Sequence, residues 1–227
     1  MLATAVERRS ISASVRPYRP EDREAVRRIY ADTAFFGEPV ETYFDDRELF
    51  ADLGVAAYLR CFPQYVFVAD SDEGVCGYIL GCPTGDVGIR KQVMVLLPGI
   101  LTALACRRYR LGRKSLLYGL DNLWVALRGE LIEVHDRRYP ANLHINVAAG
   151  RRGQGLGSAL LDAYLEKLRS EGIAGVHLVT TELNQAAVRL YRRHGFELLT
   201  SRPSRLWYRY LGRELQLLAF GLTLAQP

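Results

Sequence analysis

The sequence predicts a single domain of mixed α/β class. Its 227 residues are 49% hydrophobic and 24% charged, which is the composition of a packed globular chain and excludes a disordered or fibrous one. Short apolar runs with strand character alternate along the chain with segments of helical periodicity. One glycine-rich segment near residue 155 joins a strand directly to a helix. The domain is expected to span residues 11–227, after a loose tail at residues 1–10.

The first part of the domain is predicted to contain a strand, two helices and a hairpin. Alternation in ISASVRP predicts a strand over Ile11–Pro17. Acidic residues after Pro20 open a helix whose apolar positions have helical spacing. A second helix is expected over Arg47–Cys61. The β-rich runs Tyr65–Ala69 and Val75–Leu80 are separated by the sequence DSDEG, which is typical of a hairpin.

Residues 84–130 depart from this alternation of strand and helix patterns and are expected to form a helical insertion. They contain an uncharged apolar run, Val93–Cys106, and an apolar helix pattern between Leu116 and Leu127. A Pro-Gly pair interrupts the run, which is too short to cross a bilayer. No membrane span is therefore expected.

The last part of the chain returns to alternating strands and helices. The helix near residue 160 has a continuous apolar face. The expected strands are Leu131–His135, Leu143–Ala148, Val176–Thr180, Phe196–Leu199 and Leu206–Tyr210, and the expected helices are Leu156–Leu168 and Gln185–His194.

The formal net charge of +5 is too small to indicate a nucleic-acid partner by itself. Five positive charges fall within the eight residues Arg107–Lys114. We interpret this cluster either as a solvated helix end or as a site for an acidic substrate, a phosphate or an anionic lipid. A nucleic-acid interface is disfavoured, because few aromatic side chains alternate with these charges. No nucleic-acid partner is expected.

The cysteines and the N-terminus indicate a cytoplasmic protein. Cys61, Cys76, Cys82 and Cys106 form no CxxC pair, and no histidine lies near them at zinc-ligand spacing. They are expected to be reduced, mostly buried thiols. The N-terminal sequence MLATAVERRSIS lacks the apolar core of a signal peptide. Neither a metal site nor a secretory leader is expected.

The most specific local signal is the segment LHINVAAGRRGQGLGSALL, residues 143–161. A strand enters a loop that carries three alternating glycines, and a helix follows at once. Glycine lets backbone N–H groups approach a ligand closely, and a helix N-terminus adds unpaired N–H groups and partial positive charge. The segment therefore predicts a phosphate or pyrophosphate site, with Arg151 and Arg152 beside it. It lacks the lysine of a Walker A loop and the third glycine of a Rossmann fingerprint.

A second pattern lies downstream, between Asn184 and Phe196. Asn184 is suited to cap a helix. Tyr191 follows two helical turns later on the same face. Gly195 is suited to end that helix with a positive φ.

Together the two segments resemble the GNAT family of N-acetyltransferases. The family's pyrophosphate motif, R/Q-x-x-G-x-G/A, is matched by Arg152, Gly155 and Gly157. Its later signature, N-x-x-A-x-x-L-Y-x-x-x-G-F, is matched by Asn184, Ala187, Leu190, Tyr191, Gly195 and Phe196. The resemblance covers about residues 11–83 and 130–211 and is strong over 141–199. It implies a mixed, mostly antiparallel, splayed sheet flanked by helices, with the helical insertion placed before the central strand.

The resemblance also implies transfer of an acetyl group from acetyl-CoA to a primary amine, by direct attack within a ternary complex. Backbone groups of Val147 and Ala149 are expected to contact the pantetheine arm. The other expected cofactor residues are Arg151, Arg152, Gly153, Gln154, Gly155, Gly157, Ser158, Asn184 and Tyr191.

Tyr191 matches the family's general acid and is expected to protonate the leaving thiolate; a packing role on the helix is the alternative. The base is open. Asn146 stands where related LHID sequences carry Asp, and an amide cannot act as a base. His144 shares its strand face and has an ordinary pKa suited to a base, but a structural, hydrogen-bonded histidine is the favoured interpretation. Glu133 and His135 are weaker candidates.

The acceptor side is the least specified part of the sequence. Tyr78 is expected to line it, and a small-molecule amine is favoured over a protein lysine or N-terminus. The apolar stripes of the insertion are expected to pack on the domain, and the insertion itself either to border the acceptor site or to form a homodimer surface. The alternative function is a non-catalytic acyl-CoA-binding module, which the missing Asp of the LHID pattern favours and Tyr191 opposes.

Overall fold

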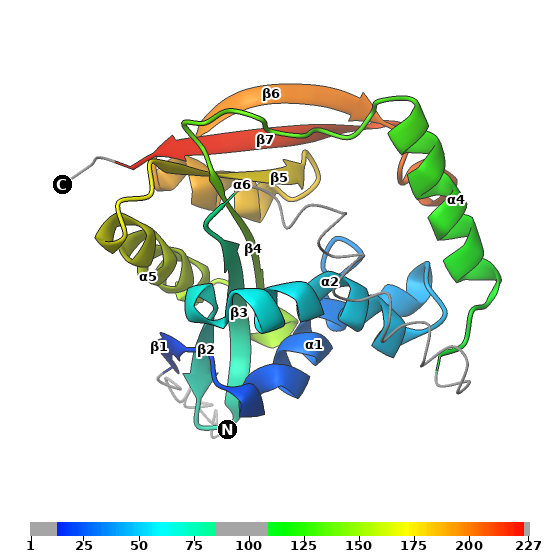
Figure 1. The fold of residues 1–227 in the computed structure, drawn as a ribbon. Coiled ribbons are helices and arrows are strands. Elements are labelled where there is room, and N and C mark those ends of the chain that lie inside the picture. Colours follow the sequence, from blue (N-terminus) through cyan, green and yellow to red (C-terminus); the bar gives the residue numbers. More distant parts are fainter. Residues whose placement is uncertain (1–12, 85–108, 225–227) are drawn as a thin grey trace, which may run out of the picture.

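The computed structural model describes residues 13–84 and 109–224. The expected tail lies outside the described residues, as do the apolar run Val93–Cys106 and the first two arginines of the Arg107–Lys114 cluster. The described chain forms one seven-stranded sheet with helices on both faces (Figure 1).

The strand order in the sheet is β1-β2-β3-β4-β5-β7-β6. Neighbouring strands are antiparallel except for β4 and β5, which are parallel. This arrangement confirms the mixed, mostly antiparallel sheet that the sequence predicts. The strands are β1 (Ala13–Pro17), β2 (Phe67–Ser71), β3 (Gly74–Cys82), β4 (Ala141–Val147), β5 (Gly175–Thr181), β6 (Glu197–Ser204) and β7 (Leu215–Thr223).

Helices cover the sheet in two layers. Helices α1 and α2 pack on one face of β2, β3 and β4, and α5 packs on the other. Helix α6 lies on the same side as α5, where its Tyr191 ring contacts Phe220 of β7. Helix α4, from the expected insertion, lies beside the end of the sheet where β6 ends and β7 begins (Figure 1). The α-helices are α1 (Arg23–Asp32), α2 (Arg47–Cys61), α4 (Arg113–Leu127), α5 (Leu156–Ser170), α6 (Gln185–Arg193) and α7 (Tyr208–Leu211). The short 3-10 turns are η1 (Pro20–Asp22), η2 (Val40–Thr42), η3 (Pro63–Tyr65) and η4 (Ala149–Arg151).

The two parallel strands separate soon after they meet. Pairing between β4 and β5 is limited to Ala141 with Val176 and Asn142 with His177. Strand β4 nevertheless continues beside β3 as far as Val147. One edge of β4 beyond Asn142 therefore has no strand neighbour, and its backbone groups are available to a ligand.

Two predicted strands are wrong. Leu131–His135 is not in the sheet: the carbonyl oxygens of Gly129 and Leu131 accept hydrogen bonds from the Arg202 guanidinium, at 2.5 and 3.1 Å. A side chain thus takes the place of a neighbouring strand. Leu206–Tyr210 has a strand-like alternation but forms a turn and α7, because Trp207 is buried among other aromatic rings. The last strand is β7, whose continuous apolar sequence the sequence analysis missed.

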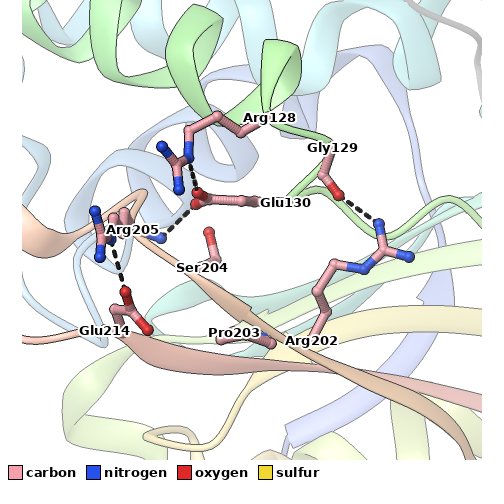
Figure 2. A pocket seen from close by; sticks show the side chains of 8 residues that line it. All are labelled: Arg128, Gly129, Glu130, Arg202, Pro203, Ser204, Arg205 and Glu214. Carbon is pink, nitrogen blue, oxygen red and sulfur yellow. Dashed lines mark hydrogen bonds and ion pairs between the residues drawn. The ribbon is translucent and has the colours of Figure 1, made fainter.

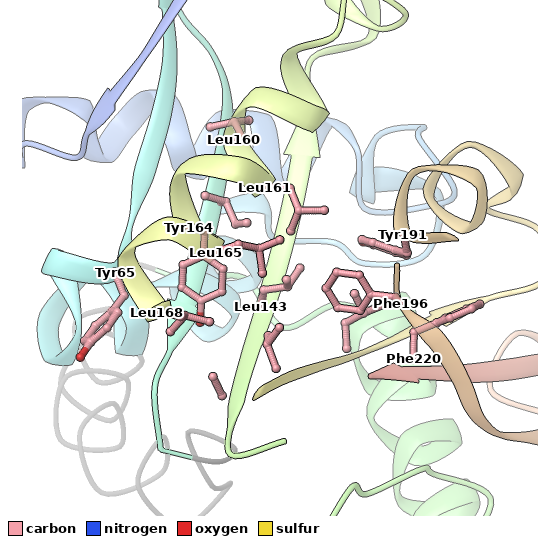
Figure 3. Close-up of a cluster of buried hydrophobic side chains, with 14 of the residues drawn as sticks. Tyr65, Leu143, Leu160, Leu161, Tyr164, Leu165, Leu168, Tyr191, Phe196 and Phe220 are labelled. Atoms are coloured by element: carbon pink, nitrogen blue, oxygen red, sulfur yellow. The ribbon is translucent and has the colours of Figure 1, made fainter. Parts of the chain in front are cut away.

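The larger hydrophobic core lies between the sheet and helices α5 and α6 (Figure 3). Leucines from one face of α5 enclose Tyr164, which is fully buried. Its hydroxyl donates a 2.7 Å hydrogen bond to the carbonyl oxygen of Asn142, at the point where β4 and β5 separate. The ring lies directly over Gly81 of β3, so that a methyl group at this glycine would overlap it.

We expect Gly81→Ala to lower the free energy of unfolding by about 3 kcal/mol, because the buried Tyr164 ring must move and its hydrogen bond must lengthen. Gly77→Ala on the same strand is the matched control. Its methyl group would lie 3.3 Å from its nearest neighbours, and a loss below about 1 kcal/mol is expected. Urea unfolding monitored by circular dichroism measures both. Equal losses for the two variants would contradict this account of the core.

Candidate active site

The glycine loop presents a run of unpaired backbone N–H groups. The turn η4 ends at Arg151, and α5 begins at Leu156. The N–H groups of residues 153–158 donate to no acceptor among the described residues, whereas the next N–H, of Ala159, bonds to the carbonyl oxygen of Gly155 at 3.1 Å. Six successive free donors at the N-terminus of a 15-residue helix form a site for a phosphate or pyrophosphate group.

Two of the loop glycines are required by the backbone. Gly153 has a φ of 77° and Gly155 a φ of 82°, which is the left-handed region that other residues adopt at a cost. Nothing lies within 4 Å of the position where a Cβ would stand on either glycine. No neighbouring side chain therefore crowds the loop at these two glycines.

The two arginines of the loop have different partners. Arg151 forms a 2.5 Å ion pair with Glu73 in the β2–β3 turn, so its charge is already compensated. The exposed Arg152 donates to the carbonyl oxygen of Val147 at 3.1 Å and to that of Gly37 at 3.4 Å. Arg152 has no carboxylate partner among the described residues, and it remains the better candidate for pairing with a phosphate.

Strand β4 carries a chain of hydrogen-bonded polar groups on the face toward α1. Thr33 donates its hydroxyl hydrogen to the Ile29 carbonyl oxygen at 2.7 Å, so it accepts from the Asn146 amide, at 2.6 Å. The same Asn146 NH₂ group donates to the Tyr78 hydroxyl at 3.1 Å. These two bonds fix the orientation of the amide and leave its oxygen without a partner among the described residues.

His144 completes the chain and lies between two aromatic rings. Its Nδ1 is 3.5 Å from the Tyr78 hydroxyl, and the rings of Tyr30 and Tyr78 lie 5.3 and 6.1 Å from its own. Burial lowers the pKa of His144 to about 4. The imidazole is therefore neutral at neutral pH, and it is a weaker base than an exposed histidine.

The lowered pKa of His144 makes stability depend on pH. An unfolded histidine takes up a proton near its ordinary pKa of 6.5, whereas the folded one does so near 4. Between these values the unfolded chain binds more protons, so stability falls as pH decreases. From about pH 7.5 to about pH 5 we expect His144 to account for a loss of about 2 kcal/mol. Urea unfolding at both pH values measures it.

His144→Gln is the control for this pH dependence. Its unfolding free energy should change less with pH than that of the original chain, by about the same 2 kcal/mol. An unchanged pH dependence in the variant would show that other groups cause it.

Tyr191 lies on α6 on the opposite side of the sheet from His144. Its ring packs 5.6 Å from that of Phe196 and 6.2 Å from that of Phe220, and it projects toward β4 and α5 (Figure 3). Burial raises its pKa above the ordinary value of 10, so the phenol stays protonated. The hydroxyl forms no hydrogen bond with the described residues. The ring is buried, and its hydroxyl is a donor that is free to bind a ligand.

The other predicted site residues fall into two groups. Asn184 caps α6 as the sequence predicts, and its side-chain oxygen accepts from the Ala187 N–H at 3.2 Å. Glu133 and His135 form a 2.9 Å pair with each other at the surface. They follow a segment that is bound to β6, the edge strand farthest from β1, and no contact joins them to His144 or Asn146. The structure does not bring them to the polar chain on β4.

Sequence reasoning missed three features beside this site. Thr33 belongs to the polar chain and the Tyr30 ring packs on its His144, but no local motif marks either residue. The turn at Phe36 and Gly37, with φ of 51° and 101°, lies against Arg152. Thr181, at the end of β5, has a buried hydroxyl without a hydrogen-bond partner. Of these, only Thr181 had a sequence signal for a place near the site, since it lies three residues before Asn184, where the second motif begins.

A separate pocket of about 270 Å³ lies at the C-terminal end of α4 (Figure 2). Arg128 and Glu130 form a 2.6 Å ion pair in it, as do Arg205 and Glu214. None of the predicted site residues lines this pocket, so it is not the site on β4 and the glycine loop.

The described residues offer no candidate for a metal site or for a membrane-spanning helix. They contain no group of three or more His, Cys, Asp or Glu side chains arranged to hold a metal ion. None of the described helices has the length and apolar character needed to cross a bilayer.

Comparisons with known proteins agree with this geometry. The model of the acetyltransferase (GNAT) family matches residues 23–196. N-acetyltransferase 8F1 of Rattus norvegicus is 31% identical over 116 residues, which cover 46% of this chain and 52% of that protein. The matches to curated relatives span about half of their length.

Solved structures share the fold over nearly the whole chain. The crystal structure of SsHAT has a TM-score of 0.65 and 28% identity, and it covers 95% of this chain and 100% of that one. The structure of a GNAT phosphinothricin acetyltransferase from Sinorhizobium meliloti, in complex with acetyl-CoA, has a TM-score of 0.58 and 15% identity, covering 95% and 90%.

Proposed function

Because this chain belongs to the GNAT family of acetyltransferases, we propose that it transfers an acetyl group from acetyl-CoA to a primary amine. The observation that carries the proposal is the run of six free N–H groups at residues 153–158, directly after a strand whose edge is open. The first feature fits a pyrophosphate, and the second fits the amide-containing arm of CoA. The acetyl-CoA complex of the Sinorhizobium relative has the same fold.

The cofactor is proposed to lie across the loop and along β4. The N–H groups of Gly153, Gln154, Gly155, Gly157 and Ser158 would hold the pyrophosphate. Arg152 would exchange its carbonyl contacts for a charged phosphate oxygen, which is the stronger hydrogen bond. Backbone groups of Val147 and Ala149 would contact the pantetheine arm, with Asn184 and Tyr191 on the other side of the opening.

Attack by the amine nitrogen on the acetyl carbonyl breaks the C–S bond and leaves a thiolate on CoA. Tyr191 is proposed to donate its phenolic hydrogen to that sulfur. Its raised pKa keeps the hydrogen in place until the sulfur becomes negative, and the proton that the attacking nitrogen loses restores the phenol. The hydroxyl has no competing partner in the described chain.

Two unpartnered oxygens are proposed to hold the acceptor amine. The side-chain oxygen of Asn146 and the hydroxyl of Thr181 project to the same side of the sheet, on the two strands that separate. Each can accept a hydrogen from the nitrogen. Asn146 and a weakly basic His144 provide no strong base here, so we propose that the amine loses its first proton to solvent before attack.

The acceptor is proposed to be a small-molecule amine, and the compartment the cytoplasm. The three described cysteines, Cys61, Cys76 and Cys82, are free thiols, which suits a reducing environment. The relative from Sinorhizobium is called a phosphinothricin acetyltransferase, which is consistent with a small acceptor.

Release of the CoA thiol from acetyl-CoA, measured against a panel of amino acids, polyamines, aminoglycosides and peptides, tests the proposal. Turnover with a small amine supports it, and turnover with peptides alone would assign a protein acceptor instead. Calorimetric binding of acetyl-CoA without turnover on any acceptor would favour a non-catalytic acyl-CoA-binding module.

A further inference from the structure

Helix α4 exposes a continuous apolar stripe. Leu116, Leu120, Leu123, Trp124 and Leu127 recur at spacings of three and four residues and share one face of the helix. Their side chains are 56–74% exposed, and the preceding Leu111 is 51% exposed. The other exposed large apolar residues of the described chain are scattered singly over different elements. A cluster of this kind on one helix marks a docking surface.

The stripe cannot be buried by rotation of the helix, because the opposite face of α4 is fixed. Asp45 accepts from the Ser115 N–H at 2.8 Å and so caps the helix from another segment. The ring of Tyr118 packs 4.8 Å from that of Tyr43. A side chain at Gly112 would overlap Asp45, so this glycine permits the close approach.

Positive charges flank the stripe and have few acidic partners. Arg110 and Arg113 precede it and form no ion pair with the described residues. Cations at a helix N-terminus oppose the helix dipole, so they do not serve helix stability. Asp121 is the only acidic residue of α4 and is bound to Arg209 by two 2.8 Å hydrogen bonds.

The other end of the stripe has a smaller excess of positive charge, because Arg128 is paired with Glu130 there. Arg128 follows the most exposed leucine, Leu127, and borders the pocket of Figure 2. That pocket contains three guanidinium groups against two carboxylates. Arg202, its third arginine, is bound to carbonyl oxygens and lacks a carboxylate partner in the described chain.

We propose that α4 docks this protein onto the surface of a membrane that contains anionic lipids. The leucines and Trp124 would enter the boundary between headgroups and acyl chains, and the flanking arginines would contact lipid phosphates and carboxylates. The helix would lie in the plane of the surface, in agreement with the absence of a membrane-spanning helix among the described residues.

Charge favours this partner over a second copy of the chain. If two α4 helices packed antiparallel on their stripes, Arg113 of one copy would lie near Arg128 of the other. Parallel packing would place Arg113 beside its own counterpart. Parallel packing thus brings like charges together, and antiparallel packing sets Arg113 beside Arg128, which Glu130 already compensates. Neither arrangement offers Arg113 a free carboxylate from α4, whereas anionic lipid headgroups would neutralise it.

Sedimentation with lipid vesicles tests the proposal on the full chain. We expect binding to phosphatidylcholine vesicles that contain about 30% phosphatidylserine, and weaker binding to pure phosphatidylcholine or at high salt. The double variant Leu120→Ser/Leu123→Ser should bind at least about tenfold more weakly. Leu198→Ser is the control: it removes another exposed leucine, 47% exposed, at the opposite end of β6 from the pocket, and should bind normally.

Tryptophan fluorescence gives an independent measurement, since Trp124 is 59% exposed and Trp207, the second tryptophan, is 8% exposed. Anionic vesicles should shift the emission to shorter wavelength, and Trp124→Phe should abolish the shift. Absence of binding to any vesicle would overturn the proposal, as would equal binding by the double variant and the original chain. A dimer in solution that the double variant dissociates would overturn it in favour of a second copy.

Discussion

Replacing Tyr191 by phenylalanine is expected to lower kcat by about 10²-fold while leaving the affinity for acetyl-CoA nearly unchanged. The substitution removes one hydroxyl that has no partner among the described residues, so the folded chain loses no hydrogen bond. The rings of Phe196 and Phe220 keep their packing partner. A lower kcat would then result from the loss of the proton donor to the leaving thiolate. Steady-state CoA release and calorimetric binding of acetyl-CoA measure the two quantities.

Tyr164→Phe is the control for this prediction, because the Tyr164 hydroxyl has a hydrogen-bond partner in the core and is given no part in the reaction. That hydroxyl donates a buried 2.7 Å bond to the Asn142 carbonyl oxygen. Its removal is expected to cost about 1–2 kcal/mol of stability with little effect on kcat at a temperature where the chain stays folded. If Tyr191→Phe kept the original kcat, Tyr191 would be a packing residue, and the proton would have to come from solvent.

The glycine loop and the α6 cap were predictable from the sequence, because each depends on backbone geometry that few residues satisfy. Gly155 has a positive φ, and Asn184 accepts the N–H that an N-cap must satisfy. Helix α2 has the predicted bounds, Arg47–Cys61, since an acidic N-cap precedes it. Such local constraints leave a local signature.

The polar chain on β4 was only half predictable. Strand alternation places His144 and Asn146 on one face, but it does not reveal that Thr33, 113 residues away in the sequence, fixes the amide. The lowered pKa of His144 likewise results from burial under Tyr30 and Tyr78, which is a tertiary effect. The strand predicted over Leu131–His135 is wrong for the same reason: the guanidinium of the distant Arg202 donates to the Leu131 carbonyl oxygen, which a neighbouring strand would otherwise do.

The apolar stripe of α4 shows the reverse case. The sequence predicted the helix from its leucines and the packing of those leucines on the domain. The second prediction is wrong, since Leu116, Leu120 and Leu123 are 56–59% exposed; an amphipathic pattern is the same whether its apolar face is packed inward or outward. The structure places a different set, including Tyr118 and Val125, toward the protein. The expectation that the insertion borders the acceptor site is therefore not needed to explain its leucines.

Gly155→Asp is expected to weaken acetyl-CoA binding by more than about 10²-fold. Aspartate tolerates the left-handed conformation better than most residues, and nothing lies within 4 Å of the position of the new Cβ, so the loop should keep its shape. Its carboxylate, however, would stand among the free N–H groups of residues 153–158. There it would compete for those donors and repel the pyrophosphate, at a cost of several kcal/mol for charges about 4 Å apart.

Gly155→Asn separates charge from shape in this prediction. Asparagine has the same size and the same tolerance for positive φ but no charge, so its dissociation constant should rise by less than about tenfold. Calorimetric titration with acetyl-CoA at two salt concentrations measures both variants. The aspartate effect should shrink at high salt because it is electrostatic. Equal losses in the two variants would mean that the glycine matters for space alone, and tight binding by Gly155→Asp would place the pyrophosphate away from this loop.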